Sequence, residues 1–184
     1  MEADDIERYL AELGAELKNR GIKKPVRILL IGGAYMLLLA NSPRSTKDID
    51  IFWLDEDGLQ QVYTPLRESV KIIKQKHDLD ADWFNYLAQM LMYDEVIVPD
   101  GKLWKRFGPI HVYAPAREYI LALKIAAGRD KDLADCAILL SKTPIRTREQ
   151  AQHVVQRYLL PAGLQRNAES IEHALRWLFE GKRE

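Results

Sequence analysis

The stretch Ile28–Trp53 constrains the fold of this 184-residue chain more than any other part of it. It begins as an apolar run, breaks at Gly32-Gly33, and ends with two aspartates one residue apart, Asp48 and Asp50. Residues i and i+2 of a strand point to the same face, so a strand that begins at Asp48 would project both carboxylates together. The stretch therefore predicts a strand, a glycine bend that opens a helix, and a second strand that carries paired acids.

The paired acids and the bend favour the binding of a metal ion and a phosphate. Two carboxylates held side by side repel, and one takes up a proton unless a positive charge lies between them. Mg²⁺ is the usual partner, because it takes oxygen ligands and keeps open positions for phosphate. The bend follows a strand over Val26–Ile31 and opens a helix over about Ala34–Ala40, so backbone N–H groups and the helix dipole face an anion. Glycine lets the phosphate approach the backbone closely. The two features together predict a site for a nucleoside triphosphate.

Neither half of this pattern is specific when it is taken alone. A Gly-Gly pair after a strand is more often a tight turn, and the dinucleotide fingerprint G-x-G-x-x-G is absent. An Asp-x-Asp pair is more often a solvated strand end. Phosphatases of the haloacid dehalogenase type place this pair after a strand, whereas Ser42–Lys47 is polar and loop-like. Glycosyltransferases use Asp-x-Asp without the preceding glycine turn. The combination of the two motifs is more informative than either one alone.

The two motifs resemble those of the nucleotidyltransferase superfamily of DNA polymerase beta type, whose signature is a Gly-Gly or Gly-Ser turn followed by Asp-x-Asp. The intervening Arg44-Ser45-Thr46-Lys47 looks like the form found in the AbiEii-type toxin nucleotidyltransferases and their uncharacterised bacterial relatives. The resemblance extends to Lys124 and to the step Arg129–Asp132, so it covers about Val26–Leu140.

The resemblance implies roles for particular residues. Asp48 and Asp50 would hold two Mg²⁺ (or Mn²⁺) ions together with a third acid on a neighbouring strand. We expect Asp82 in that role, with Asp80 as the second choice and a solvated acidic edge as the alternative. The expected nucleotide-binding residues are Gly32, Gly33, Arg44, Ser45, Thr46, Lys47, Arg129 and Asp132.

Lys124 lies in an apolar helical stretch, where a lysine must reach solvent or find an anion. The resemblance places this lysine in the catalytic site, where it would hold the triphosphate. The alternative is an ion pair with Asp132 or Asp135 between two helices.

The implied activity is the transfer of a nucleoside monophosphate from an NTP to a hydroxyl, with release of pyrophosphate. The acceptor stays open between RNA (tRNA, as the toxin resemblance implies), a protein side chain and a small molecule. The alternative is a catalytically weak protein of the same fold that binds a nucleotide or a partner protein, for example as half of a toxin–antitoxin pair.

Composition limits the partners, the metal sites and the cellular location that we expect for the chain. The chain has 27 basic and 27 acidic residues, so overall charge does not imply nucleic-acid binding. A single cysteine, Cys136, excludes an internal disulfide and any zinc site built on several cysteines. The longest apolar stretch, Ile28–Ala40, is too short for a membrane span, and the acidic N-terminus lacks a signal-peptide pattern. We therefore expect a cytoplasmic protein with no membrane partner.

The order of elements predicts an α+β (α/β) fold. Apolar periodicity predicts a helix over 4–20, with Ile6, Leu10, Leu13 and Leu17 on its inward face, and a helix over Leu59–Lys76. Helices are expected throughout the part that follows Pro115. There Thr147-x-x-Gln150 is typical of a capping box at a helix start, and Pro161–Gly163 predicts a break before the last helix. The further strand candidates are Asp80–Phe84, Val96–Val98, Leu103–Phe107 and Ile110–Tyr113, the last two joined as a hairpin by a turn at Gly108-Pro109. This order gives a small mixed β-sheet flanked by helices in a catalytic core, 1–114, and a helical C-terminal lobe, 115–184.

Overall fold

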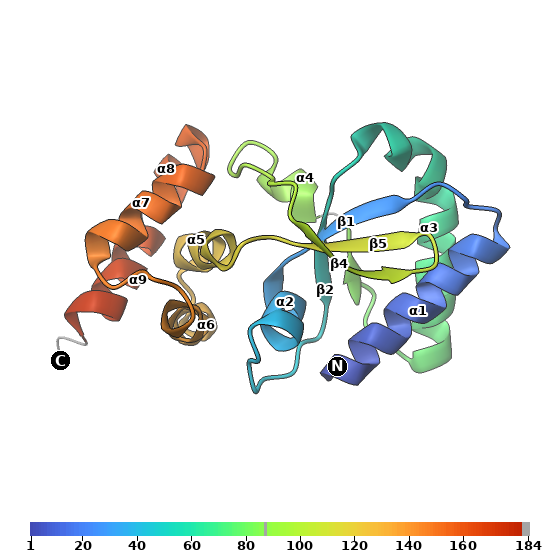
Figure 1. Ribbon diagram of the computed structural model, residues 1–184, viewed down its shortest axis with the longest axis horizontal. Helices are drawn as coiled ribbons and strands as arrows, with labels where there is room; N and C mark the ends of the chain where they lie inside the picture. The colour runs from blue at the N-terminus through green and yellow to red at the C-terminus, as the bar shows by residue number, and fades with distance from the viewer. Residues whose placement is uncertain (87, 182–184) are drawn as a thin grey trace. The chain divides into compact units, whose positions relative to one another are not determined.

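The structure, a computed structural model, describes residues 1–86 and 88–181, with the backbone alone at 56–60 and 88. Strands and helices are mixed up to Ala114 and helices alone follow, which confirms the predicted α+β class (Figure 1). The chain divides into two compact units, which we call the sheet unit (Met1–Leu91 with Asp100–Pro115) and the helical unit (Met92–Pro99 with the chain from Ala116 onwards). The division expected between 114 and 115 differs in assigning Met92–Pro99 to the core.

The strand β1 (Val26–Leu30) lies in the middle of the sheet, whose order among the described residues is β3-β2-β1-β5-β4. The other strands are β2 (Ile49–Trp53), β3 (Phe84–Asn85), β4 (Lys102–Phe107) and β5 (Ile110–Ala114). β1 is antiparallel to β2 and parallel to β5, while β2 and β3 are parallel and β4 and β5 antiparallel. The sheet is therefore mixed, as predicted, and the strand before the glycine bend is a direct neighbour of the strand that carries Asp50.

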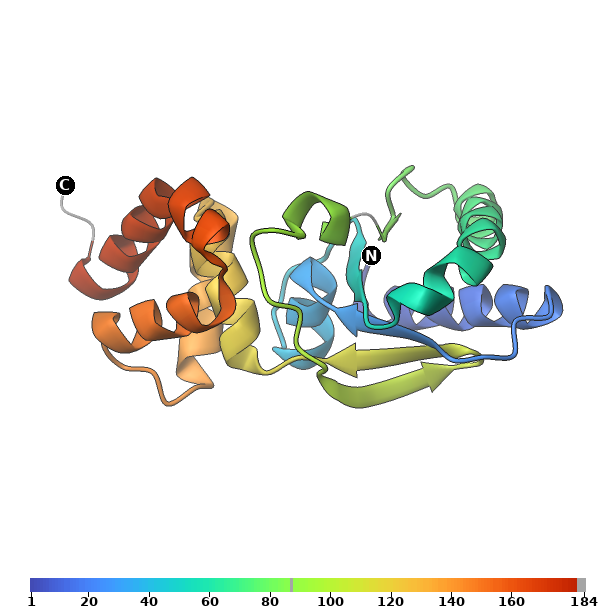
Figure 2. The ribbon, with the colours of Figure 1, turned by 90° about the horizontal axis from the view of Figure 1, so that it is seen from above.

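The predicted strands agree with the structure to different degrees. The hairpin of β4 and β5 is present (Figure 2), and Gly108 and Pro109 form its turn. The strand expected over Asp80–Phe84 is wrong except at Phe84, because Ala81 and Asp82 lie in a turn and the pairing with β2 covers only Phe84–Asn85. The strand expected over Val96–Val98 is reduced to one isolated bridge, from Val96 to Leu159.

Four helices of the described residues precede β4 in the chain. They are α1 (Ala3–Asn19), α2 (Gly32–Leu39), α3 (Glu56–His77) and α4 (Ala88–Met92). α1 and α3 lie side by side (Figure 1). The residues of α1 that were predicted to face inward are all buried: Ile6, Leu10, Leu13 and Leu17. No helix in the described part of the chain has both the length and the apolar character that crossing a membrane requires.

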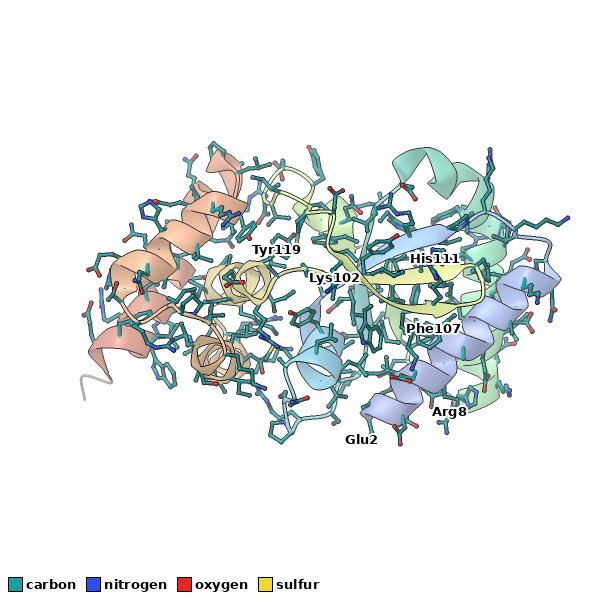
Figure 3. The ribbon with its side chains drawn as sticks, in the orientation of Figure 1. Glu2, Arg8, Lys102, Phe107, His111 and Tyr119 are labelled. Atoms are coloured by element: carbon teal, nitrogen blue, oxygen red, sulfur yellow. The ribbon has the colours of Figure 1, made fainter. Side chains whose placement is uncertain are left out.

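α1 approaches β4 closely at Gly14. A Cβ at Gly14 would overlap the carbonyl oxygen of Phe107 and lie 2.7 Å from its carbonyl carbon. Phe107, labelled in Figure 3, is the last residue of β4. Because the obstacle is backbone, a side chain there must push the helix away from the sheet. The hydrogen atom in place of a side chain is therefore what lets α1 pack at this depth.

Replacing Gly14 by alanine should lower the free energy of unfolding by at least about 2 kcal/mol, because an overpacked contact outweighs the gain of about 1 kcal/mol that alanine brings to a helix interior. The measurement is urea unfolding followed by circular dichroism. The matched control is the reverse change at the exposed neighbour, Ala15→Gly, which should cost about 1 kcal/mol from helix propensity alone. A stabilised Gly14→Ala variant would contradict the close approach.

The helical unit is built around α5 (Arg117–Ala127), which contacts three of its other helices. The other helices are α6 (Asp130–Ser141), α7 (Arg148–Tyr158), α8 (Pro161–Arg166) and α9 (Ala168–Glu180). The capping box predicted at Thr147 is present, since Thr147 Oγ1 accepts from the backbone N–H of Gln150. The break expected at Pro161–Gly163 is wrong. Pro161 is instead the first residue of α8, where its missing N–H costs no helical hydrogen bond.

Candidate functional site

The end of β1 and the start of α2 lie against the side chain of Asp50. Ile31 is the N-cap residue of α2, and Gly32, the first residue of the helix, has a φ of 65°. A Cβ at Gly32 would overlap Asp50 Oδ2 and lie 3.1 Å from Asp50 Cγ. The backbone N–H of Ile31 also donates to the carbonyl oxygen of Asp50, at 3.0 Å. The glycine bend and the second carboxylate therefore meet at one place, which only a residue without a side chain permits.

Asp48 reaches the same bend through Thr46. The Thr46 hydroxyl donates toward Asp48 Oδ1 at 3.2 Å and the Asp48 carbonyl oxygen at 3.1 Å. The same hydroxyl oxygen lies 2.5 Å from where a Cβ of Gly33 would be. Asp50 thus lies at Gly32 and Asp48 is held near Gly33, one carboxylate for each glycine of the bend.

The remaining loop residues of the predicted site lie on the surface. Arg44, Ser45 and Lys47 are exposed, between the end of α2 and the start of β2. The backbone N–H of Thr46 donates to the carbonyl oxygen of Met1 at 3.1 Å, so the loop is tied to the start of α1. Their contacts with a nucleotide stay predictions.

Asn85 is the residue of β3 that stands beside Asp50. The two are partners in the parallel register of β2 and β3, and Asn85 Nδ2 donates to Asp50 Oδ1 at 2.7 Å. Sequence reasoning missed this residue, although one signal was present. Asn85 is the first polar residue after the apolar pair Trp83-Phe84, at the end of a segment expected to join the sheet.

Asp82 does not take the place expected for it. It is exposed, in the turn that precedes β3, while the position beside Asp50 belongs to Asn85 three residues later. Within the described residues no group of three or more His, Cys, Asp or Glu side chains is arranged to hold a metal ion. The strand expected to carry Asp82 starts later than its sequence suggests, and a role of Asp82 in metal binding stays a prediction.

The donor atoms at the bend are oxygens, which are the ligands that hard divalent cations prefer. Asp48 and Asp50 supply carboxylate oxygens, Asn85 adds one amide oxygen, and the missing side chain of Gly32 makes room for the Asp50 carboxylate itself. Mg²⁺ and Mn²⁺ take such oxygen ligands and complete their shells with water or phosphate. Asp48 and Asp50 are the residues that would hold the ion.

Lys124 lies in the helical unit, where it joins two acids of α6. Its Nζ lies 2.8 Å from Asp132 Oδ1 and 2.9 Å from Asp135 Oδ2, and all three side chains are buried. Arg129 Nε adds a hydrogen bond to Asp132 Oδ2 at 2.5 Å. Of the two alternatives for Lys124, the ion pair between helices is present, with both acids. A contact of Lys124, Arg129 or Asp132 with a nucleotide stays a prediction.

The charges of this cluster stabilise one another. Burial alone lowers the pKa of Lys124, but its hydrogen bonds to Asp132 and Asp135 and their charges outweigh burial, so the pKa is raised. Burial likewise raises the pKa of Asp132, but the hydrogen bonds and charges of Arg129 and Lys124 reverse this, and the pKa is lowered. Lys124 and Asp132 are therefore both charged at neutral pH.

The lowered pKa of Asp132 predicts how its contribution to stability depends on pH. The contribution is fully present above the unfolded-state pKa of about 3.9 and is lost as the pH falls through the lower folded-state value. The difference in unfolding free energy between wild type and Asp132→Asn should therefore be about 2 kcal/mol and constant from about pH 5 to 9, and should shrink below about pH 4. Hydrogen exchange of α5 and α6 across a urea series measures it. A difference that grows on acidification would contradict the assignment.

Gly32→Ala tests whether the bend and Asp50 meet as described. The left-handed backbone costs about 1 kcal/mol for alanine, and the added methyl group must also displace the Asp50 carboxylate. We expect a total loss of about 2 kcal/mol in urea unfolding. Gly21→Ala is the control, because Gly21 has a φ of 81° with nothing within 4 Å of the added Cβ. Equal losses for the two variants would argue against contact at Gly32.

No family model matches the chain, and neither a curated protein nor a solved structure is significantly similar to it. The support for a function therefore comes from the geometry of the bend, from Asp48 and Asp50, and from the resemblance of the two motifs.

Proposed function

We propose that this protein transfers a nucleoside monophosphate from an NTP to a hydroxyl group, with Mg²⁺ or Mn²⁺ as the cofactor. The observation that supports it best is the contact between Asp50 and Gly32, because it brings a carboxylate to the first turn of α2. Backbone N–H groups at a helix start bind phosphate, and a carboxylate beside them binds the metal ion that accompanies a triphosphate.

In the proposed reaction the acceptor oxygen attacks the α-phosphorus of the NTP. A bond forms between them, the bond from the α-phosphorus to the α–β bridging oxygen breaks, pyrophosphate leaves, and the hydroxyl proton passes to water. A divalent cation would favour ionisation of the hydroxyl and offset charge on the pyrophosphate. Gly32 and Gly33 orient the triphosphate through their backbone. Thr46 orients Asp48, and the exposed cations Arg44 and Lys47 offset negative charge in the transition state.

The acceptor is RNA, a protein hydroxyl or a small molecule. The test incubates the protein with Mg²⁺, each of the four NTPs labelled at the α-phosphate, and total bacterial RNA. Label should appear in a macromolecule or in the protein itself, should not appear when the label is on the γ-phosphate, and should vanish with a chelator. Absence of transfer from all four NTPs to RNA, protein and small hydroxyl compounds would overturn the proposal.

A second candidate function is favoured by Asn85, which is neutral where the resemblance implies a third acid. In this case the protein binds a nucleotide or a partner protein with little catalysis, for example as half of a toxin–antitoxin pair. Equilibrium dialysis with labelled NTP and Mg²⁺ separates the two functions. Nucleotide binding without transfer would support a nucleotide-binding protein with little catalysis, and absence of any Mg²⁺-dependent NTP binding would exclude both this function and the transferase.

A further inference from the structure

The position of Asn85 determines what stands on the β3 side of Asp50. β3 is only two residues long, and its register pairs Ile49 with Phe84 and Asp50 with Asn85. Residues paired in a parallel ladder project to the same face of the sheet, so the Asn85 side chain lies on the face that carries the Asp50 carboxylate. The 2.7 Å hydrogen bond between them agrees with this placement.

The hydrogen bond fixes which end of the Asn85 amide faces Asp50. An ionised carboxylate only accepts hydrogen bonds, so the NH₂ end must point to Asp50 Oδ1 and the amide oxygen is the one metal-binding atom that Asn85 retains. A hydrogen bond to a charged acceptor is about twice as strong as one between neutral groups. Asn85 therefore orients Asp50 and occupies one of its two oxygens on the side where a third acid would otherwise stand.

Charge decides how many cations such a site retains. Asp48 and Asp50 together carry two negative charges, which balance one divalent cation. A second cation a few ångströms away repels the first, and the triphosphate oxygens that both would share must be supplemented by a further negative ligand from the protein to hold it in place. Asn85 contributes an oxygen but no charge. The position that would allow a second ion is thus filled by a neutral side chain.

We propose that Asn85 is a positioning residue for Asp50 and that it limits the site to one divalent cation for each bound nucleotide. The inference rests on the proposed function, because it assumes that Asp48 and Asp50 hold the metal ion. It departs from the two-ion arrangement that the sequence resemblance implies. It also makes Asn85→Asp the substitution that would create a second cation site.

The test counts Mn²⁺ bound to the purified protein at saturating concentration of an NTP analogue with a methylene group between the α- and β-phosphates, which cannot be transferred. Equilibrium dialysis with electron paramagnetic resonance gives the number of Mn²⁺ ions per chain. Wild type should retain one, Asn85→Ala one, and Asn85→Asp two. Asp82→Asn is the matched control for a nearby acid and should still retain one.

The possible results separate this inference from the proposed function. Two ions in wild type, with label transfer intact, would overturn the role of Asn85 and leave the function standing. One ion in a folded Asn85→Asp variant, or none in Asp82→Asn, would also overturn it. Binding of neither nucleotide nor Mn²⁺ by wild type would overturn the proposed function itself.

Thermal unfolding provides a second readout that does not need two ions to be counted. Without metal, Asn85→Asp should melt several degrees below wild type, because a second carboxylate then faces Asp50. Mn²⁺ should raise the melting temperature of Asn85→Asp more than that of wild type. An equal rise in both would count against the inference. If Asn85→Asp does not fold, the number of Mn²⁺ ions bound per chain by wild type and by Asn85→Ala still tests the inference. Two ions in either protein would overturn the limit of one cation.

Discussion

Replacing Lys124 by methionine is expected to lower the free energy of unfolding of the helical unit by about 3–5 kcal/mol. The change keeps most of the volume of the side chain but removes the ammonium group that lies 2.8 Å from Asp132 and 2.9 Å from Asp135. Both acids are buried. Arg129 still pairs with Asp132 after the substitution. A buried carboxylate that loses a cationic partner is less favourable in its charged form and takes up a proton more readily.

The measurement is hydrogen exchange of α5 and α6 over a urea series, which reports on the helical unit by itself. Lys76→Met, measured in the same way by exchange of α1 and α3, is the matched control, because Lys76 of α3 forms an ion pair of similar length, 3.0 Å to Glu12 of α1, with 58% of its side chain exposed. Exposed pairs contribute about 0–1 kcal/mol, so this variant should be close to wild type. Equal losses for the two lysine variants would show that burial does not set the value of the Lys124 pairs. Adding Asp132→Asn and Asp135→Asn to Lys124→Met should restore part of the loss, since no buried charge is then left unpaired.

Local signals in the sequence predicted the elements that depend on a few adjacent residues. The apolar stripe of α1 predicted its buried face, Thr147 and Gln150 predicted the start of α7, and Gly108-Pro109 predicted the turn between β4 and β5. In each case the residues that decide the structure lie within a few positions of one another. Their hydrogen bonds and burial pattern can therefore be inferred without knowledge of the rest of the chain.

The neighbour of Asp50 could not be predicted in this way. It depends on the register of β2 against β3, between residues 35 positions apart. Reading the strand as Asp80–Phe84 instead of Phe84–Asn85 moves the expected neighbour by three residues, from Asn85 to Asp82. Such a shift exchanges an amide for a carboxylate, so an error of a few residues in a strand boundary changes the expected chemistry of the site.

Lys124 shows a different limit of prediction from the sequence. Its apolar surroundings showed that it needs an anion, and Asp132 and Asp135 were among the candidates. Their identity as its partners follows from how α5 and α6 pack, which sets the distances between side chains eight and eleven positions apart. A pattern predicts that a charge must be neutralised, and the tertiary structure selects what neutralises it.

Asp50→Asn is expected to lower the rate of label transfer by at least about 1000-fold, which corresponds to about 4 kcal/mol of transition-state stabilisation. The substitution keeps the shape of the side chain at Gly32 and removes only its charge. It should therefore leave the fold intact while it weakens the binding of the cation on which the proposed reaction depends. The rate of transfer from α-labelled NTP at saturating Mg²⁺ measures the effect, and circular dichroism verifies the fold.

Asp78→Asn is the matched control, because it makes the same chemical change at an exposed aspartate that ends α3 in a left-handed conformation, which asparagine tolerates well. It should transfer label within about twofold of wild type. An Asp50→Asn variant with near-wild-type transfer would remove Asp50 from the reaction and, with it, the argument from the Gly32 contact. A loss in Asp50→Asn that higher Mn²⁺ partly reverses would identify cation binding, and not the fold, as the step that Asp50 supports.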